Sequence, residues 1–363
     1  MRILRTYILR EHTAPFFVTL GGLTAVLLVG NIIKFADLVI SKGVSVFDVL
    51  RLVIYLLPYM LSFTIPMACL IAMILAFGRL STDYELIAMR ASGVAPIRLV
   101  FPMLIVGLVM SCLLVIINDR VVPKSHLAFR QQLKAIGVKR PTAYIEAGTF
   151  IKEFPPYTIF VYQVEGQKLS NIRIYEPQPK GPTRTITAER GEFHRLPNKR
   201  GVQLLLYDGT MDEWDLQHPG SLYKVTFGTY EMALRSDQDD PNLVGRKLRE
   251  MTFKELVAER KQLRAEGIET LPLNLELHRK IASSFAALLF IAFGLALGLR
   301  LHHHERLMSY VWVLSIFMLY YLGTIGMNAI ALKGWLKPTW AMWIPNLVGG
   351  TLSGVMIVKA VRR

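Results

Sequence analysis

Residues 49–77 read VLRLVIYLLPYMLSFTIPMACLIAMILAF, an apolar run with one charged residue, Arg51. A helix needs about 20 predominantly apolar residues to cross a bilayer core of roughly 30 Å. This run exceeds that length, and helix tilt accommodates the excess. Five other stretches have the same character, so we expect six membrane-spanning helices: Pro15–Ile33, Val49–Phe77, Leu99–Ile117, Ile281–Leu301, Leu307–Leu332 and Trp340–Val361.

A polar insert, Asp119–Arg279, separates the first three apolar runs from the last three. Its first part carries short runs rich in Tyr, Val, Ile, Thr and Phe, broken by turn residues such as Asp208-Gly209. Strands without intervening helices favour an antiparallel sandwich or jelly roll. We expect strands at Tyr157–Val164, Asn171–Tyr175, Thr183–Ala188, Gln203–Tyr207 and Leu222–Phe227.

Apolar residues return to helical spacing after the acidic segment at residues 237–241, which predicts an amphipathic linker helix ending near Gly267. The expected fold is therefore an α-helical polytopic membrane protein with an inserted, jelly-roll-like all-β domain. Its expected parts are residues 1–118 (three spans and a short helix at about 80–93), 119–240 (β domain), 241–279 (linker helix) and 280–363 (three spans).

Lys and Arg in short loops predict the orientation, because short loops rich in these residues tend to stay in the cytoplasm. With a cytoplasmic N-terminus, eleven of these residues lie inside and five outside. We therefore expect both termini in the cytoplasm and the large insert outside it. The inside set is Arg2, Arg5, Arg10, Arg79, Arg90, Arg98, Arg300, Arg306, Lys359, Arg362 and Arg363; the outside set is Lys34, Lys42, Arg51, Lys333 and Lys337.

The net charge of +15 lies mostly in the membrane half, since the polar insert holds 25 basic and 21 acidic residues. A nucleic-acid-binding protein would gather the excess on one soluble face. This distribution instead fits loops that contact anionic lipid phosphates, so we expect membrane lipids and no nucleic acid among the partners.

Signatures of catalysis are missing from the sequence. It contains no Gly-x-x-x-x-Gly-Lys-Ser/Thr phosphate loop, no His-Glu-x-x-His and no Gly-x-Ser-x-Gly. Cys69 and Cys112 fall inside apolar runs and are interpreted as core residues. Consecutive side chains point in different directions, so His302–His304 predicts a polar turn rather than a metal site. We expect no catalytic residue, metal or cofactor in this chain.

Residues 78–96, GRLSTDYELIAMRASGVAP, predict a short helix between the second and third spans. Thr82 and Glu85 have the spacing of a capping box, and Gly93 followed by Pro96 ends the helix. Leu80, Tyr84, Ile87 and Ala91 would form an apolar stripe. Such a helix suits the bilayer surface or the groove of a soluble partner, and composition leaves both open.

This loop, GRLSTDYE at 78–85, strongly resembles the LptF/LptG permeases of the lipopolysaccharide export ABC transporter. The loop and KGVS at 42–45 are more similar to LptF, whereas IIKF at 32–35 resembles the first helix of LptG. Ser283-Ser284 stands where the family has a proline early in the fourth span. Other matches are YILRE (7–11), YLLP (55–58), IPM (65–67), LHRK (277–280) and WIPNL (343–347).

The resemblance implies a transport subunit without an ATP site in the bacterial inner membrane. Two permeases would enclose a V-shaped cavity for lipopolysaccharide, and an LptB-type ATPase dimer would grip each coupling helix. An LptC-like single-span protein would stack its β domain on the periplasmic insert, and an LptA-like bridge would continue outward. The residues expected to couple to the ATPase are Leu80, Asp83, Tyr84, Glu85, Ile87 and Arg90.

The resemblance also implies that Lys34 contacts a lipid phosphate, as a lysine of the LptG first helix does. The inward sheet positions Ile172, Ile174, Val225 and Phe227 are expected to contact acyl chains. A closed sandwich would have the same pattern.

Two other classes of function are alternatives to transport. A membrane-anchored scaffold or assembly factor would need no coupling helix. An intramembrane enzyme would need paired polar residues at mid-span, whereas Asn118, Asp119 and Asn328 stand isolated or near span ends in the sequence.

Overall fold

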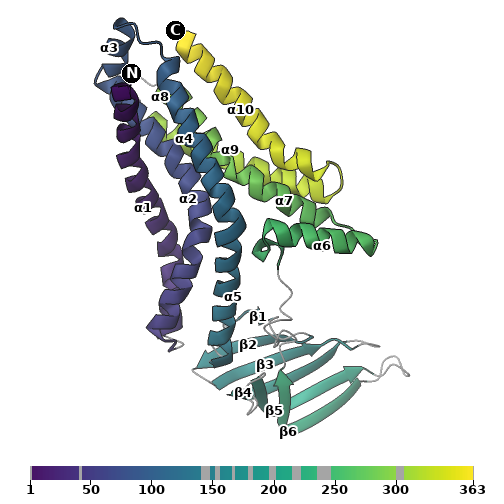
Figure 1. Cartoon of the computed structure of the whole chain (residues 1–363). Coiled ribbons are helices and arrows are strands. Elements are labelled where there is room, and N and C mark those ends of the chain that lie inside the picture. Colours follow the sequence, from purple (N-terminus) through teal and green to yellow (C-terminus); the bar gives the residue numbers. More distant parts are fainter. Residues whose placement is uncertain are drawn as a thin grey trace. The chain divides into compact units, whose positions relative to one another are not determined.

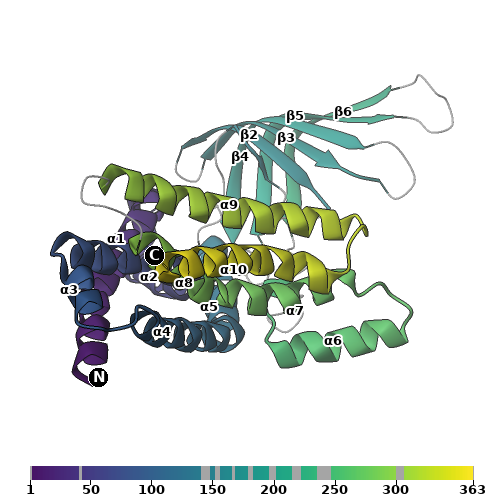
Figure 2. The ribbon, with the colours of Figure 1, turned by 90° about the horizontal axis from the view of Figure 1, so that it is seen from above.

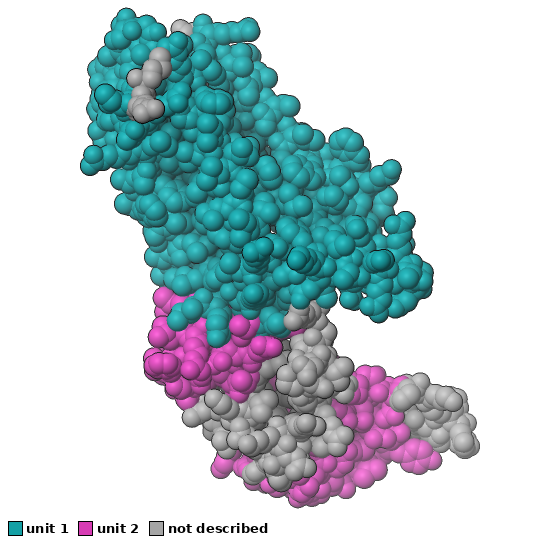
Figure 3. All heavy atoms as spheres, viewed as in Figure 1, with its two compact units in different colours: residues 1–31, 54–127, 247–363 teal, residues 32–53, 128–246 magenta. Residues whose placement is uncertain are grey.

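The structure is a computed structural model of the chain. It describes residues 2–40, 43–139, 148–151, 156–165, 168–178, 183–195, 202–214, 222–234, 247–299 and 306–362. The chain divides into two compact units, coloured separately in Figure 3. The helical unit comprises residues 1–31, 54–127 and 247–363, and the second unit comprises residues 32–53 and 128–246.

Six helical stretches among the described residues are long and apolar enough to cross a membrane, which confirms the expected six spans. Before the insert they are α1 (Arg2–Ile40), α2 (Val46–Thr82) and the stretch that begins with α4 (Ile97–Ile116). After it come α7 (Leu271–Ser284) with α8 (Ala286–Gly298), then α9 (Arg306–Leu332) and α10 (Pro338–Arg362), as labelled in Figure 1. The short helix α3 (Glu85–Ala91) joins α2 to α4.

The third span continues well beyond residue 118, where the sequence placed the start of the β domain. A π-helical turn, η1 (Ile117–Val121), follows α4 directly, and α5 (Val122–Lys139) continues the helix. The residues that flank the turn have helical dihedral angles, so the helix enters the insert without a break. Composition changes here, but secondary structure does not.

The fourth span is made of two pieces. The amphipathic linker helix α6 (Phe253–Ala265) precedes it, begins with a Thr252–Glu255 capping box and is followed by Gly267 at φ +75°. A 3₁₀ turn, η3 (Leu248–Glu250), precedes α6. Helices α7 and α8 then meet at Phe285, close to the Ser283-Ser284 pair.

Helix α8 lies at the centre of the helical unit and packs against α4 and α10, with α10 also contacting α7 and α9 (Figure 2). Its buried face joins residues of α1, α2, α3 and α4 in one core cluster. Gly294 and Gly298 let α8 approach α2 closely. A Cβ at Gly294 would lie 2.6 Å from Met73 Cβ, and one at Gly298 would lie 2.6 Å from Phe77 Cβ.

The inserted β domain is one antiparallel sheet in which each described strand pairs with its neighbour in sequence. Its core lies on one face, where Ile159, Ile172, Ile174 and Leu204 are fully buried. The expected inserted β domain is thus confirmed. The strands are β1 (Phe150–Ile151), β2 (Thr158–Glu165), β3 (Lys168–Glu176), β4 (Arg184–Arg195), β5 (Val202–Trp214) and β6 (Leu222–Leu234).

Strands β4, β5 and β6 are longer than the sequence indicated, and the turn predicted at Asp208-Gly209 was wrong. Both residues lie inside β5, and the strand passes through a left-handed residue, Asp208 at φ 52°. Asn171 in β3 has a similar φ of 54°, and pairing is skipped at both positions. The register is the same on both sides of each residue, so no residue is inserted and the strand continues through it.

Candidate coupling surface and polar junction

Helix α3 does not begin with the predicted capping box. Helix α2 continues through Thr82, whose Oγ1 donates to the carbonyl of Gly78 in its own helix at 2.9 Å. The chain then reverses direction at Tyr84, which has φ 56°, and Glu85 is the first residue of α3. Because Thr82 belongs to the preceding helix, its hydroxyl is not available to cap α3.

The predicted end of α3 at Gly93 is correct. Gly93 has φ +77°, and its N–H donates to the carbonyl of Arg90. The N–H of Val94 donates to the carbonyl of Met89. This pair of bonds is the Schellman arrangement, which favours glycine at the left-handed position. The helix therefore has a fixed length of two turns.

Bonds to α1 and α10, near the two ends of the chain, hold α3 and the end of α2 in place. The hydroxyl of Tyr7, near the start of α1, donates to the two carboxylate oxygens of Glu85 at 2.8 and 3.0 Å. Arg79 pairs with Glu11 at 2.7 Å, and Arg90 donates to the carbonyl of Ala360 in α10 at 3.5 Å. Helix α3 and both termini therefore lie at the same end of the helical unit.

The six residues expected to couple to an ATPase do not share one face. Leu80 is buried in the core of the helical unit, and Leu86 is the buried anchor of α3. The stripe predicted through Leu80 was therefore wrong, since Leu80 belongs to α2. Tyr84 and Ile87 are each 61% exposed, and Asp83 and Arg90 are exposed beside them.

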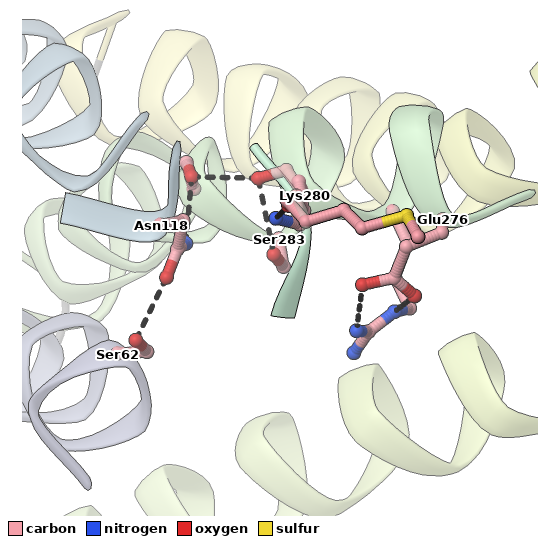
Figure 4. Close-up of polar contacts among 8 residues, drawn as sticks. Ser62, Asn118, Glu276, Lys280 and Ser283 are labelled. Carbon is pink, nitrogen blue, oxygen red and sulfur yellow. Dashed lines mark hydrogen bonds and ion pairs between the residues drawn. The ribbon is translucent and has the colours of Figure 1, made fainter. Parts of the chain in front are cut away.

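A second cluster of polar side chains joins helices within the helical unit (Figure 4). Asn118, on the π-helical turn η1, accepts from the hydroxyl of Ser62 in α2 at 2.7 Å. Its Nδ2 donates to Ser284 Oγ at the end of α7 at 2.9 Å. Asn118 therefore connects three helices, although the sequence suggested that it was isolated.

The break between α7 and α8 leaves backbone groups that other helices satisfy. Ser111 of α4 accepts from the N–H of Leu288 at 3.1 Å, and Asn346 of α10 donates to the carbonyl of Ala282 at 2.7 Å. Backbone groups freed within a membrane need such partners, because lipid offers none. Side chains of α4 and α10 therefore stabilise the break between α7 and α8.

The linker helix α6 is attached to the same junction. Asp119 accepts from the N–H of Phe253 at 2.6 Å, and the ammonium of Lys280 donates to the carbonyl of Met251. Glu276 and Arg279 pair with each other through two bonds of 2.6 and 2.9 Å (Figure 4). Sequence reasoning missed this junction, because its members are far apart in the chain.

The residues expected to contact lipid fall in the second unit, and they differ in exposure. Lys34 lies within α1 and is exposed. Ile172 and Ile174 are fully buried, Phe227 packs against the same core, and Val225 is 56% exposed. Val225 pairs in register with Met211, which pairs with Ile186, so it lies on the core face as predicted, and it is exposed because β6 is the edge strand of the sheet.

Among the residues that the structure describes, no group of three or more His, Cys, Asp or Glu side chains could hold a metal ion. The His302–His304 segment lies outside the described residues.

Comparison with known proteins identifies the family to which this architecture belongs. The sequence pattern of the lipopolysaccharide export system permeases LptF/LptG matches residues 6–359. The chain belongs to the LptF/LptG permease family. The family resemblance inferred from the short motifs is thus confirmed, and the chain is a multi-pass inner-membrane protein of this family.

A curated relative of this LptF/LptG permease comes from Rickettsia prowazekii (strain Madrid E) and is described as the uncharacterized protein RP871. The two are 25% identical over 238 residues, which is 65% of each chain. The permease thus matches somewhat less than two thirds of that relative, whose description adds no activity.

Proposed function

We propose that this permease works as one half of an ABC transporter that extracts lipopolysaccharide from the outer leaflet of the inner membrane. A separate LptB-type ATPase dimer would supply the energy by docking on α3. The observation that carries this proposal is the exposed apolar pair formed by Tyr84, which precedes α3, and Ile87, which lies in α3, a two-turn helix that bonds to α1 and α10. Because these bonds hold α3 against the membrane helices, a movement of α3 would be transmitted to those helices.

The proposed orientation places both termini and α3 in the cytoplasm and the β domain in the periplasm. The excess of Lys and Arg in the short loops on the α3 side supports it. The bonds from Tyr7 to Glu85 and from Arg90 to Ala360 add support, since they hold both ends of the chain beside α3.

The remaining partners follow from the family. A second LptF/LptG-type permease would complete the cavity, and the long apolar faces of α1 and α9 are available for it, with Val18 and Leu319 more than 70% exposed. An LptC-like protein would stack on the β domain, and an LptA-like bridge would accept the lipid. Lys34 would meet a lipid phosphate, a role open to an exposed cation.

The test of this proposal is purification of the tagged chain with its associated proteins, followed by assay of ATP hydrolysis. We expect an ATPase to copurify. Glu85→Gln keeps an oxygen that accepts from Tyr7 but removes the charge, so it isolates an ionic contact with the ATPase. Loss of one charge-assisted hydrogen bond should weaken association about tenfold.

Tyr7→Phe is the complementary variant, because it keeps the charge of Glu85 and removes its support within the chain. We expect a smaller loss of association than for Glu85→Gln. Glu269→Gln, an exposed carboxylate between α6 and α7, is the matched control and should have no effect. The proposal fails if no ATPase accompanies the wild-type protein, and the direct role of Glu85 fails if its Gln variant associates normally.

A further inference from the structure

An apolar groove with a volume of about 670 Å³ runs along the helical unit between α4 and α10. Helix α8 forms its floor, since it packs against both of the other helices. Phe101, Ile105 and Leu108 form one wall, and Leu347 and Gly354 contribute to the other. The groove does not involve α3, whereas Phe285, Leu288 and Asn346 at the break between α7 and α8 also line it.

The lining is mostly apolar, and the donor groups of its polar side chains bond to backbone carbonyls. Ser353 Oγ donates to the carbonyl of Gly350 at 3.1 Å, and Asn346 Nδ2 donates to the carbonyl of Ala282 at 2.7 Å. Both donors are thus directed at helix backbone. Along α10 the lining extends from Trp343 to Ile357, about 21 Å at 1.5 Å per residue, so the groove can hold a long hydrocarbon chain.

The two ends of the groove differ in charge. Arg98 lies on the same face of α4 as Phe101, Ile105 and Leu108, because these residues are three and four positions apart. It is exposed, and its guanidinium makes no hydrogen bond or ion pair with the described residues. At the opposite end the rings of Phe285 and Trp343 meet at 5.6 Å.

Other cations surround the Arg98 end. Lys359 and Arg362 are exposed in the last turns of α10, and Arg90 reaches the carbonyl of Ala360. Helices α4, α8 and α10 contain no Asp or Glu. A hydrocarbon slot that opens on cations without an ion pair among the described residues has the chemistry that binds an anionic phospholipid.

We propose that this groove binds an anionic phospholipid, with an acyl chain lying between α4 and α10 and the phosphate at Arg98. In the proposed function lipopolysaccharide meets Lys34 of α1 and the β domain, neither of which lines this groove. In the orientation given by the proposed function, this lipid belongs to the cytoplasmic leaflet, and that assignment rests on the proposed function. A transmembrane helix could also approach the open faces of Gly350 and Gly354, but it would not explain the cations.

The experiment places the purified protein, with its copurifying subunits, in nanodiscs of equal phosphatidylglycerol and phosphatidylcholine. Lipids retained after extraction are counted by native mass spectrometry, without ATP. We expect retention of phosphatidylglycerol over phosphatidylcholine. Arg98→Gln should lower this preference about fivefold, the effect of one cation near the membrane surface. Arg10→Gln, which removes an exposed cation of α1 outside the groove, should not change it.

A photo-crosslinker at Leu347, which is 51% exposed in the groove wall, identifies the occupant directly. A crosslink to phosphatidylglycerol supports the proposal, and a crosslink to a polypeptide overturns it. Equal retention of the two lipids, or an unchanged preference in Arg98→Gln, also overturns it. Because no ATPase is needed for the measurement, lipid retention without ATPase association would refute the proposed function and leave this site standing.

Discussion

Gly294 is where a single atom decides how closely two membrane helices pack. A Cβ there would lie 2.6 Å from Met73 Cβ and 3.0 Å from the carbonyl oxygen of Leu70. Neither neighbour is the free end of a flexible side chain, so α2 and α8 would have to separate. Transmembrane helices associate through close packing of this kind rather than through a hydrophobic driving force.

Gly294→Ala is therefore expected to destabilise the helical unit by about 1–3 kcal/mol, the usual cost of overpacking a core. Thermal unfolding in detergent, followed by intrinsic fluorescence, measures the change. Gly326→Ala is the control, because a Cβ at Gly326 in α9 would meet nothing within 4 Å. Equal melting temperatures for the two variants would show that α2 and α8 do not approach as closely as described.

At the scale of elements, the π-helical turn η1 and the break at Phe285 belong to one arrangement. The turn carries Asn118, which bonds to Ser284 at the end of α7, while Ser111 and Asn346 satisfy backbone groups on either side of the break. π-Helical turns inside α-helices occur frequently at functional sites. Here the turn joins α2, which leads to α3, with α5, which leads into the β domain.

A double-mutant cycle tests this junction. Asn118→Ala and Ser284→Ala should together cost less than the sum of their separate effects, with a coupling energy of about 0.6 kcal/mol and at most about 1.7 kcal/mol. Unfolding in denaturing detergent gives the three free energies. Asn118→Ala combined with Ser353→Ala should be additive, because Ser353 bonds within its own helix. Additivity in both pairs would exclude the bond between Asn118 and Ser284.

At the scale of the whole molecule, the proposed function requires that energy applied at α3 reach a lipid at the β domain. The fully buried Ile174 contacts the sheet core, whereas Ile33, the neighbour of Lys34, is 71% exposed. If acyl chains pass through the sheet core, the core must open during the transport cycle. Exposure of Ile174 would then depend on ATP, and exposure of Ile33 would not.

Photo-crosslinkers at Ile33 and Ile174 separate these states in the reconstituted transporter. We expect the Ile33 position to trap lipopolysaccharide with or without ATP, and the Ile174 position to trap it only with ATP. The crosslinked products are identified by immunoblotting against the lipid. Crosslinks from Ile174 to the protein alone, under both conditions, would mean that the core stays closed and the lipid takes another route.

The sequence by itself determined the six spans, the inserted β domain and the end of α3 at Gly93. These features depend on runs of apolar residues, on alternation within a strand and on the backbone freedom of one glycine, all of which are local. Short motifs such as LHRK at 277–280 were enough to indicate the family. Long strands were cut short in the prediction because a left-handed Asp208 looks like a turn when its partner strands are unknown.

Only the tertiary structure decided which polar side chains act together. Glu85 faces Tyr7 across 78 positions, and Asn118 faces Ser284 across 166, so no spacing rule connects them. The same holds for the groove, whose walls come from α4 and α10 and whose cation comes from the first turn of α4. Local sequence determines the type and polarity of each element, whereas contacts between distant elements determine which surfaces remain for a partner or a lipid.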